Sequence, residues 1–247
     1  MYTSRPLLKS NARIIIKTAR PSVIAASLIF LLVSLLMSTL STKLTGITVD
    51  TLITYQNYVS SGDFERALSY LTSLVPPRSA RVFILLLSIV SMIWQAGYTI
   101  FIMNTVKKSG ATFGNLLDGF SITLKLILLG FLRTLFITLW SLLFYFPGII
   151  AAYRYRMSLY LLLDHPEMGV MECLSTSKQM MKGHKWECFV LDLSFIGWWL
   201  LAAIPYVGYA VSVWVTPYVN TTYVLYYMAL AGKPVTVGPA PGQNPYM

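Results

Sequence analysis

Long apolar runs, separated by short polar segments, dominate the pattern along the chain. A helix needs about 20 apolar residues to cross the hydrocarbon core of a bilayer. Several runs have about this length or approach it, and we predict one membrane span in each. The six predicted spans are 22–40, 82–106, a third within 121–146, 148–163, 188–204 and 209–231. The predicted fold class is therefore an all-α membrane protein with about six transmembrane helices and short interfacial helices.

Turn signals divide the later runs. Phe146-Pro147-Gly148 and Pro205-Tyr206-Val207-Gly208 combine proline with glycine, so they predict short turns between spans. Pro217 lies inside the last run and predicts a kink there. The two turns separate the third predicted span from the fourth and the fifth from the sixth.

Composition supports a membrane protein and argues against a soluble one. Hydrophobic residues make up 56% of the 247 residues, charged residues make up 11%, and the mean hydropathy is +0.64. Soluble domains carry about 25% charged residues. The net charge of +10 could suggest nucleic-acid binding, but the basic residues lie mostly at the ends of apolar runs. There they determine topology and meet anionic lipid, so we expect no nucleic-acid partner.

The distribution of lysine and arginine predicts the orientation. Basic residues concentrate in 1–20, at 107–108, in 178–185 and at Lys233, whereas the predicted short outer turns have none. The positive-inside rule then places both termini in the cytoplasm. The predicted organisation is a cytoplasmic basic amphipathic segment 1–20, a six-helix transmembrane domain 21–231 and a disordered cytoplasmic tail 232–247. Within the domain, 41–81 is an outer loop and 164–187 an inner loop.

Three segments have an interfacial pattern. Lys9, Arg13, Lys17 and Arg20 share one side of a helix beside an apolar stripe, which is typical of a helix on anionic lipid. An ordinary cytoplasmic flank would look the same. Outside, 63–77 starts with Asp63 as a helix cap, and its apolar residues fall on one face. Inside, 166–183 predicts a helix with Met168, Met171, Leu174 and Met181 broadly on one side.

Residues 140–220 resemble a family of bacterial integral membrane proteins, domain-of-unknown-function family 975. The motifs that carry the resemblance are Trp140-Ser141-Leu142-Leu143, Pro147-Gly148-Ile149-Ile150, Asp164 with Pro166, Lys182-Gly183-His184-Lys185-Trp186, Leu191-Asp192-Leu193-Ser194-Phe195-Ile196-Gly197-Trp198 and Pro217-Tyr218. The resemblance implies a polytopic protein of the bacterial cytoplasmic membrane and supplies no activity. Arg154 and Arg156 depart from the mostly uncharged stretch expected of relatives.

Charges inside predicted spans are the candidate binding residues, because ionisable groups at membrane depth are costly and usually functional. Four such residues are Arg133, Arg154, Arg156 and Asp192. At 1.5 Å per residue, Asp192 lies roughly 6 Å and Arg156 roughly 12 Å into the membrane from the same side. An arginine side chain can cover that difference if the fourth and fifth predicted spans touch, so we predict that the two residues pair. Arg154 points about 200° away from Arg156 on one helix. Alternatively, the spans lie elsewhere and the arginines reach the interface.

Catalytic and metal-binding signatures are weak. His165, His184, Cys173 and Cys188 lack the paired spacing of a zinc site. Asp192 has no second intramembrane aspartate to form a protease pair, and the chain has no phosphate-binding loop. We therefore predict no enzyme, no metal and no cofactor.

Three function hypotheses remain open at the level of sequence. The first is a non-catalytic membrane protein that binds an anionic lipid or partner in an inner-leaflet pocket lined by the arginines. The second is a transporter or permease subunit in which these charges line a substrate path. The third is an assembly scaffold for another membrane protein. The predicted partners are therefore membrane lipids, anionic ones above all, with a membrane-protein partner for the third hypothesis.

Overall fold

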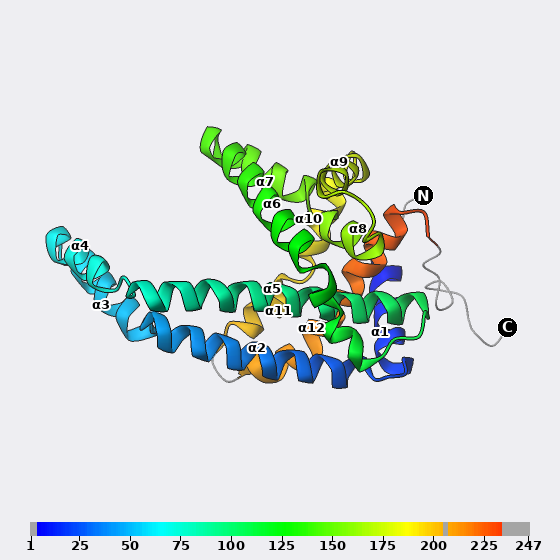
Figure 1. Ribbon diagram of the computed structural model, residues 1–247, viewed down its shortest axis with the longest axis horizontal. Coiled ribbons are helices and arrows are strands. Elements are labelled where there is room, and N and C mark those ends of the chain that lie inside the picture. The colour runs from blue at the N-terminus through cyan, green and yellow to red at the C-terminus, as the bar shows by residue number, and fades with distance from the viewer. Residues whose placement is uncertain (1–3, 205–206, 234–247) are drawn as a thin grey trace. The chain divides into compact units, whose positions relative to one another are not determined.

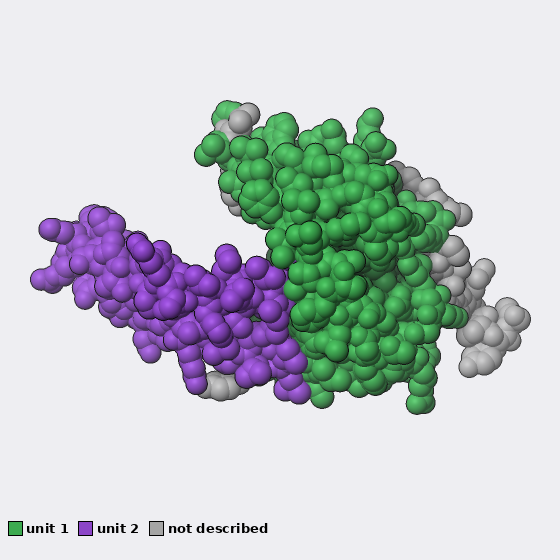
Figure 2. Space-filling view, viewed as in Figure 1, with its two compact units in different colours: residues 1–31, 93–247 green, residues 32–92 purple. Residues whose placement is uncertain are grey.

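The computed structural model of the chain describes residues 4–204 and 207–233, and all of its regular structure is helical. Two compact units are present, residues 1–31 with 93–247 and residues 32–92 (Figures 1 and 2). The all-α prediction is confirmed. The predicted disordered tail 232–247 and the turn at Pro205-Tyr206 lie largely outside the described residues.

The helices follow one another with short connections. Their bounds are α1 Arg5–Thr18, α2 Val23–Thr45, α3 Val49–Ser60, α4 Phe64–Ser73, α5 Arg78–Lys107, the 3-10 helix η1 Phe113–Ile122, α6 Thr123–Leu143, α7 Tyr145–Arg154, α8 Ser158–Asp164, α9 Val170–Met180, α10 Lys185–Leu193, α11 Ile196–Ala202 and α12 Val207–Leu230. The turn predicted at Phe146-Pro147-Gly148 is instead at Phe144, the residue between α6 and α7.

Three helical stretches are long and apolar enough to cross a membrane. They are Val23–Thr45, Arg78–Lys107 and the continuous η1–α6 stretch Phe113–Leu142. These match the first three predicted spans. At 1.5 Å per residue, 23 residues reach about 35 Å, which exceeds the roughly 30 Å of hydrocarbon.

The fourth and fifth predicted spans are not single helices. The segment predicted as 148–163 consists of α7 and α8, of 10 and 7 residues, interrupted at Tyr155–Met157. The segment predicted as 188–204 consists of α10 and α11, of 9 and 7 residues, interrupted at Ser194 and Phe195. Each piece is at most about 15 Å long, half the hydrocarbon thickness. The sequence pattern missed both interruptions because neither contains glycine or proline.

The interruption after α7 is stabilised from α9. Ser177 is completely buried, and its Oγ donates to the carbonyl oxygen of Arg154 at 2.9 Å. The same Oγ accepts from the backbone N–H of Met157 at 3.1 Å. A break in a helix leaves such groups without intrahelical partners. One serine hydroxyl therefore satisfies a carbonyl and an amide that the break exposes.

The core of the first unit lies along α12 and the second half of α5. From Val215 to Met228 most α12 side chains are buried, and so are those of α5 from Ile93 to Met103. Pro217 is inside α12, which is assigned as one helix from Val207 to Leu230. In Figure 1, α1 lies beside α12, and the two are in contact. The apolar side of α1 contributes Leu8, Ala12, Ile15 and Ile16 to this core.

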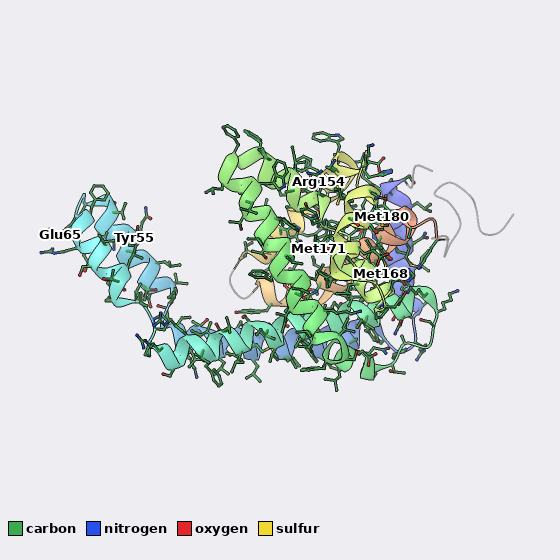
Figure 3. The ribbon with its side chains drawn as sticks, turned by 45° about the horizontal axis from the view of Figure 1, so that its top comes forward. Tyr55, Glu65, Arg154, Met168, Met171 and Met180 are labelled. Atoms are coloured by element: carbon green, nitrogen blue, oxygen red, sulfur yellow. The ribbon has the colours of Figure 1, made fainter. Side chains whose placement is uncertain are left out.

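The buried face of α9 differs from the face predicted from the sequence. Its buried residues are Val170, Cys173, Leu174 and Ser177. Met181, just beyond the helix, is fully buried, but Met171 is 57% exposed and does not share the buried side (labelled in Figure 3). Methionine spacing alone therefore gave the wrong face for Met171.

The unit formed by residues 32–92 contains a helical hairpin of α3 and α4. The α4 helix begins after Asp63, whose Oδ1 accepts from the backbone N–H of Arg66 at 3.1 Å, so the predicted cap is confirmed. The α3 helix was not predicted. Tyr58 and Tyr70 join the two helices edge to face, with ring centroids 5.8 Å apart. The predicted apolar face of α4 is largely exposed, with Phe64 at 68%.

We predict that Ser177→Ala destabilises the first unit by about 2 kcal/mol. The substitution leaves the part-buried Arg154 carbonyl and the buried Met157 amide unpaired, and an unpaired buried group costs about 1–3 kcal/mol. Ser175→Ala is the matched control, because Ser175 is exposed on the same helix. Thermal unfolding of the detergent-purified variants measures the difference. Equal stability of both variants would contradict the role given to Ser177.

Candidate functional site

An ion pair joins the two interrupted segments. Arg156 lies within the break between α7 and α8, and Asp192 lies two residues before the break between α10 and α11. The Nη1 of Arg156 donates to Oδ2 of Asp192 at 2.6 Å. Their side chains are 27% and 26% exposed, so both charges are largely withdrawn from solvent. The pairing expected from the depths of these residues is present.

Two tyrosines complete the surroundings of Asp192. Tyr153 donates to Oδ2 at 2.9 Å, and Tyr223 of α12 donates to Oδ1. The Arg156 guanidinium lies 4.5 Å from the ring centroid of Tyr223 and 5.6 Å from that of Tyr153. Both rings therefore contact the cation through their faces and the aspartate through their hydroxyls. The aspartate receives three donors, which fixes the position of the guanidinium.

An open cavity of about 620 Å³ borders this pair. Its polar lining comes from Gln95, Arg156, Asp192, Asn220 and Tyr223. Its apolar lining comes from Phe189, Leu193, Ile196, Trp199 and Val219. The volume falls within the range of about 300–1,000 Å³ typical of small-molecule sites. The cavity thus combines a charged group with an apolar wall.

The other two candidate arginines have different surroundings. Arg133 of α6 interacts electrostatically with Arg156, and no carboxylate of the described residues lies within ion-pair distance of it. It does not line the cavity. The Arg154 guanidinium lies 5.9 Å from the ring centroid of Trp140, and Arg154 does not line the cavity (labelled in Figure 3). The structure brings Arg156 and Asp192 together, places Arg133 near Arg156, and leaves Arg154 outside the site.

A second cluster surrounds Asp164 at the end of α8. Its carboxylate is only 3% exposed and accepts hydrogen bonds from Lys107, Lys233 and Tyr227. The Lys233 Nζ and the Tyr227 hydroxyl each lie 2.6 Å from Oδ2. Asp164 was notable in the sequence only as part of the family resemblance. Its partners are 57, 63 and 69 residues away, so no local pattern could reveal them.

The basic residues of the N-terminal segment are divided between two environments. Lys9 donates to the carbonyl oxygen of Ser194 at 3.1 Å, and its ammonium lies 4.2 Å from the ring centroid of Phe195. Arg13, Lys17 and Arg20 are exposed. The apolar side of α1 packs on α12, so protein occupies a face that the sequence also allowed for lipid. The lipid-surface role of the four basic residues stays a prediction.

The histidines and cysteines do not assemble into one group. His165 contacts Glu167 at 3.1 Å, and His184 contacts Glu187 at 2.9 Å. Cys173 and Cys188 are both buried and free. Within residues 4–204 and 207–233, no three histidine, cysteine or acidic side chains gather in a way that could hold a metal ion.

Replacing Asp164 with asparagine is expected to destabilise the protein by about 3–5 kcal/mol, because it removes the counter-charge of Lys107 and Lys233 in a buried site. Burial acts to raise the pKa of Asp164, but hydrogen bonds from Lys107, Lys233 and Tyr227 outweigh it and lower the pKa from 3.8 to about 2. The stabilisation is therefore complete above pH 4 or so and is lost as the pH falls through about 2.

The matched control for Asp164→Asn is Glu65→Gln, since Glu65 is exposed on α4 (labelled in Figure 3). Its effect should remain within about 0.5 kcal/mol. Unfolding midpoints at neutral pH and at pH 3 test both statements. A gap between wild type and Asp164→Asn that does not shrink on acidification would contradict the low pKa.

The comparisons with known proteins indicate no activity for the chain. No curated protein and no solved structure matches the chain. One family model does match, over residues 142–233, which is well under half of the chain but contains both interruptions, Arg156 and Asp192. Over that stretch the chain is similar to the family described as "Protein of unknown function (DUF975)".

Proposed function

We propose that this is a non-catalytic polytopic membrane protein that binds an anionic amphiphile, such as an acidic lipid, in the cavity beside Arg156. One observation carries the proposal: the lining of the cavity is divided between the Arg156–Asp192 pair with polar neighbours and a set of apolar side chains. A lipid has the same division, with a charged headgroup and apolar chains. The interrupted helices support this, because non-helical backbone at membrane depth is tolerated where it is buried in protein or lines a cavity.

Arg156 retains donors for a ligand. Among the described residues it donates one hydrogen bond, from Nη1 to Asp192, although a guanidinium has five N–H groups. Asp192 neutralises one positive charge, and Arg133 adds another nearby without a carboxylate partner in the described chain. The local balance is therefore positive, and it favours an anion over a neutral or cationic headgroup.

A six-pass topology in the bacterial cytoplasmic membrane, with both termini cytoplasmic, accompanies this proposal. Three segments predicted on the inner side share one cluster, because Lys107, Asp164 and Lys233 are joined by hydrogen bonds. Lys125, at the start of α6, donates to the carbonyl oxygens of Pro166 and Met168. These contacts support a common side for the ends of α5, α8 and α12 and for the start of α6.

A transporter is the second candidate. Interrupted helices that meet at a polar site near the membrane midplane are typical of secondary transporters. In that case the cavity would hold a soluble anion in transit rather than a lipid. Purified protein in vesicles would then accelerate anion flux, whereas a lipid-binding protein would not.

For the topology, single cysteines introduced between residues 45 and 78 should react with a membrane-impermeant thiol reagent added to intact cells. Cysteines introduced between 168 and 182 should react only after the membrane is permeabilised. Cys173 and Cys188 are buried, so they should contribute little background. The reverse labelling pattern would overturn the orientation.

For the cavity, Arg156→Gln should reduce co-purified acidic lipid at least tenfold, since a charge-assisted contact is worth about 1.5–3 kcal/mol. Arg154→Gln is the matched control, as it removes the same charge outside the cavity. Native mass spectrometry in mild detergent measures the bound lipid. Equal retention by both variants would contradict the site.

Folding must be separated from binding in that experiment. Arg156→Gln leaves Asp192 as an unpaired, largely buried charge, at a cost of about 3 kcal/mol. Combining it with Asp192→Asn removes the unpaired charge, so the double variant should recover folded yield. It should still lack bound lipid. Recovery of yield together with recovery of lipid would show that Arg156 does not bind the headgroup.

A further inference from the structure

Three basic residues of α1 line a second cavity, separate from the one beside Arg156. Arg5, Lys9 and Arg13 follow one another at intervals of four residues, so they lie along one side of the helix. Together with Pro6, Ser10 and Ser194 they border an open cavity of about 470 Å³. All of these residues belong to the same compact unit.

Two of the three cations contact aromatic rings of the protein. The Lys9 ammonium donates to the Ser194 carbonyl oxygen at 3.1 Å and lies 4.2 Å from the ring centroid of Phe195. The Arg13 guanidinium lies 5.4 Å from the ring centroid of Tyr218. Both rings are buried, with Phe195 at 0% and Tyr218 at 2% exposure, so they are rigid supports. A site whose charged groups are fixed before binding loses less entropy when a ligand binds.

The cluster has an excess of positive charge. Within the described chain, no aspartate or glutamate forms an ion pair with Arg5, Lys9 or Arg13. Burial lowers the pKa of Lys9, and the neighbouring charges of Arg13 and Arg5 lower it further, because like charges disfavour the protonated amine. An anion placed beside Lys9 would offset this repulsion.

We propose that Arg5, Lys9 and Arg13, with Ser10, form a binding site for a phosphate monoester. A phosphate monoester carries about −1.5 to −2 charges at pH 7 and has three acceptor oxygens, which suits a cavity lined by three cations. Lys9 uses one of its three N–H groups on Ser194, so two are free for phosphate oxygens. The Ser10 hydroxyl adds a neutral donor to the lining.

This site differs from a general attraction of a basic helix to an anionic surface. Lys17 and Arg20 belong to the same basic segment, but they do not line the cavity. A diffuse attraction depends on the number of charges near the membrane, at about 1 kcal/mol each, and not on which charges they are. A built site depends on the three residues that face the cavity. The two cases therefore separate when equal charge is removed from different positions.

The test compares two triple variants of the full chain that lose the same charge. Arg5→Gln/Lys9→Gln/Arg13→Gln should weaken binding of phosphatidic acid roughly 100-fold, from three lost cations. Lys17→Gln/Arg20→Gln/Lys178→Gln removes three exposed cations outside the cavity and should change the affinity less than about threefold. Native mass spectrometry measures phosphatidic acid against phosphatidylcholine. Equal losses in the two triple variants would overturn the site.

A single variant tests the site even if the triple variant fails to fold. Arg5 makes no hydrogen bond, ion pair or ring contact with any described residue, so Arg5→Gln should not affect the fold. It should weaken phosphatidic acid binding roughly fivefold. An unchanged affinity would count against the proposal even if the triple variant failed to fold.

The source of the phosphate and the independence of the site are tested in the same assay. If millimolar inorganic phosphate competes with phosphatidic acid, the ligand is a soluble phosphate. If it does not compete, the ligand is a lipid headgroup.

The comparison of the two triple variants is then repeated in a protein that also carries Arg156→Gln/Asp192→Asn, in which the cavity beside Arg156 cannot contribute. Loss of the difference between the triple variants in that background would overturn a separate site at α1.

Discussion

The ion pair between Arg156 and Asp192 determines which helices of the first unit meet, because it joins the two interrupted segments. A charged pair withdrawn from water needs further hydrogen bonds to offset desolvation. Tyr153 and Tyr223 provide them to Asp192, and Tyr223 also gives Arg156 an aromatic face. One aspartate therefore links α7, α10 and α12. Such a cluster specifies which helices meet, even where its net contribution to stability is small.

The interruptions also position the groups around the pair. Ser177 satisfies the backbone at the break after α7, which fixes α9 against it. At the other break, Ser194 offers its carbonyl to Lys9, and Phe195 offers its ring. The N-terminal helix is therefore attached to a point where α10 has ended. If α10 and α11 formed one continuous helix, the Ser194 carbonyl would accept from its own helix and Lys9 would lose that acceptor.

The sequence predicted some of this arrangement and missed other parts for identifiable reasons. Hydropathy found α2, α5 and α6, because a long apolar run has few alternatives to a helix. The pairing of Arg156 with Asp192 was predicted and is present, although both spans along which their depths were counted are interrupted. The interruptions at Tyr155–Met157 and at Ser194 were missed because their residues are compatible with a helix and tertiary contacts decide the outcome. The cluster at Asp164 joins residues too far apart in sequence for any periodicity to connect.

An excess of positive charge is common to both cavities. The chain has 19 lysines and arginines but only 9 aspartates and glutamates. Asp164 already accepts from two lysines, and Asp192 already accepts from Arg156 and two tyrosines. These carboxylates have little capacity left for Arg133 or for the three cations of α1. Positive charge that the protein cannot neutralise internally must be hydrated or matched by an external anion. One cavity contains Arg156, which is largely withdrawn from solvent, and the other contains the half-buried Lys9 between the exposed Arg5 and Arg13. An anion is the ligand class that both environments favour.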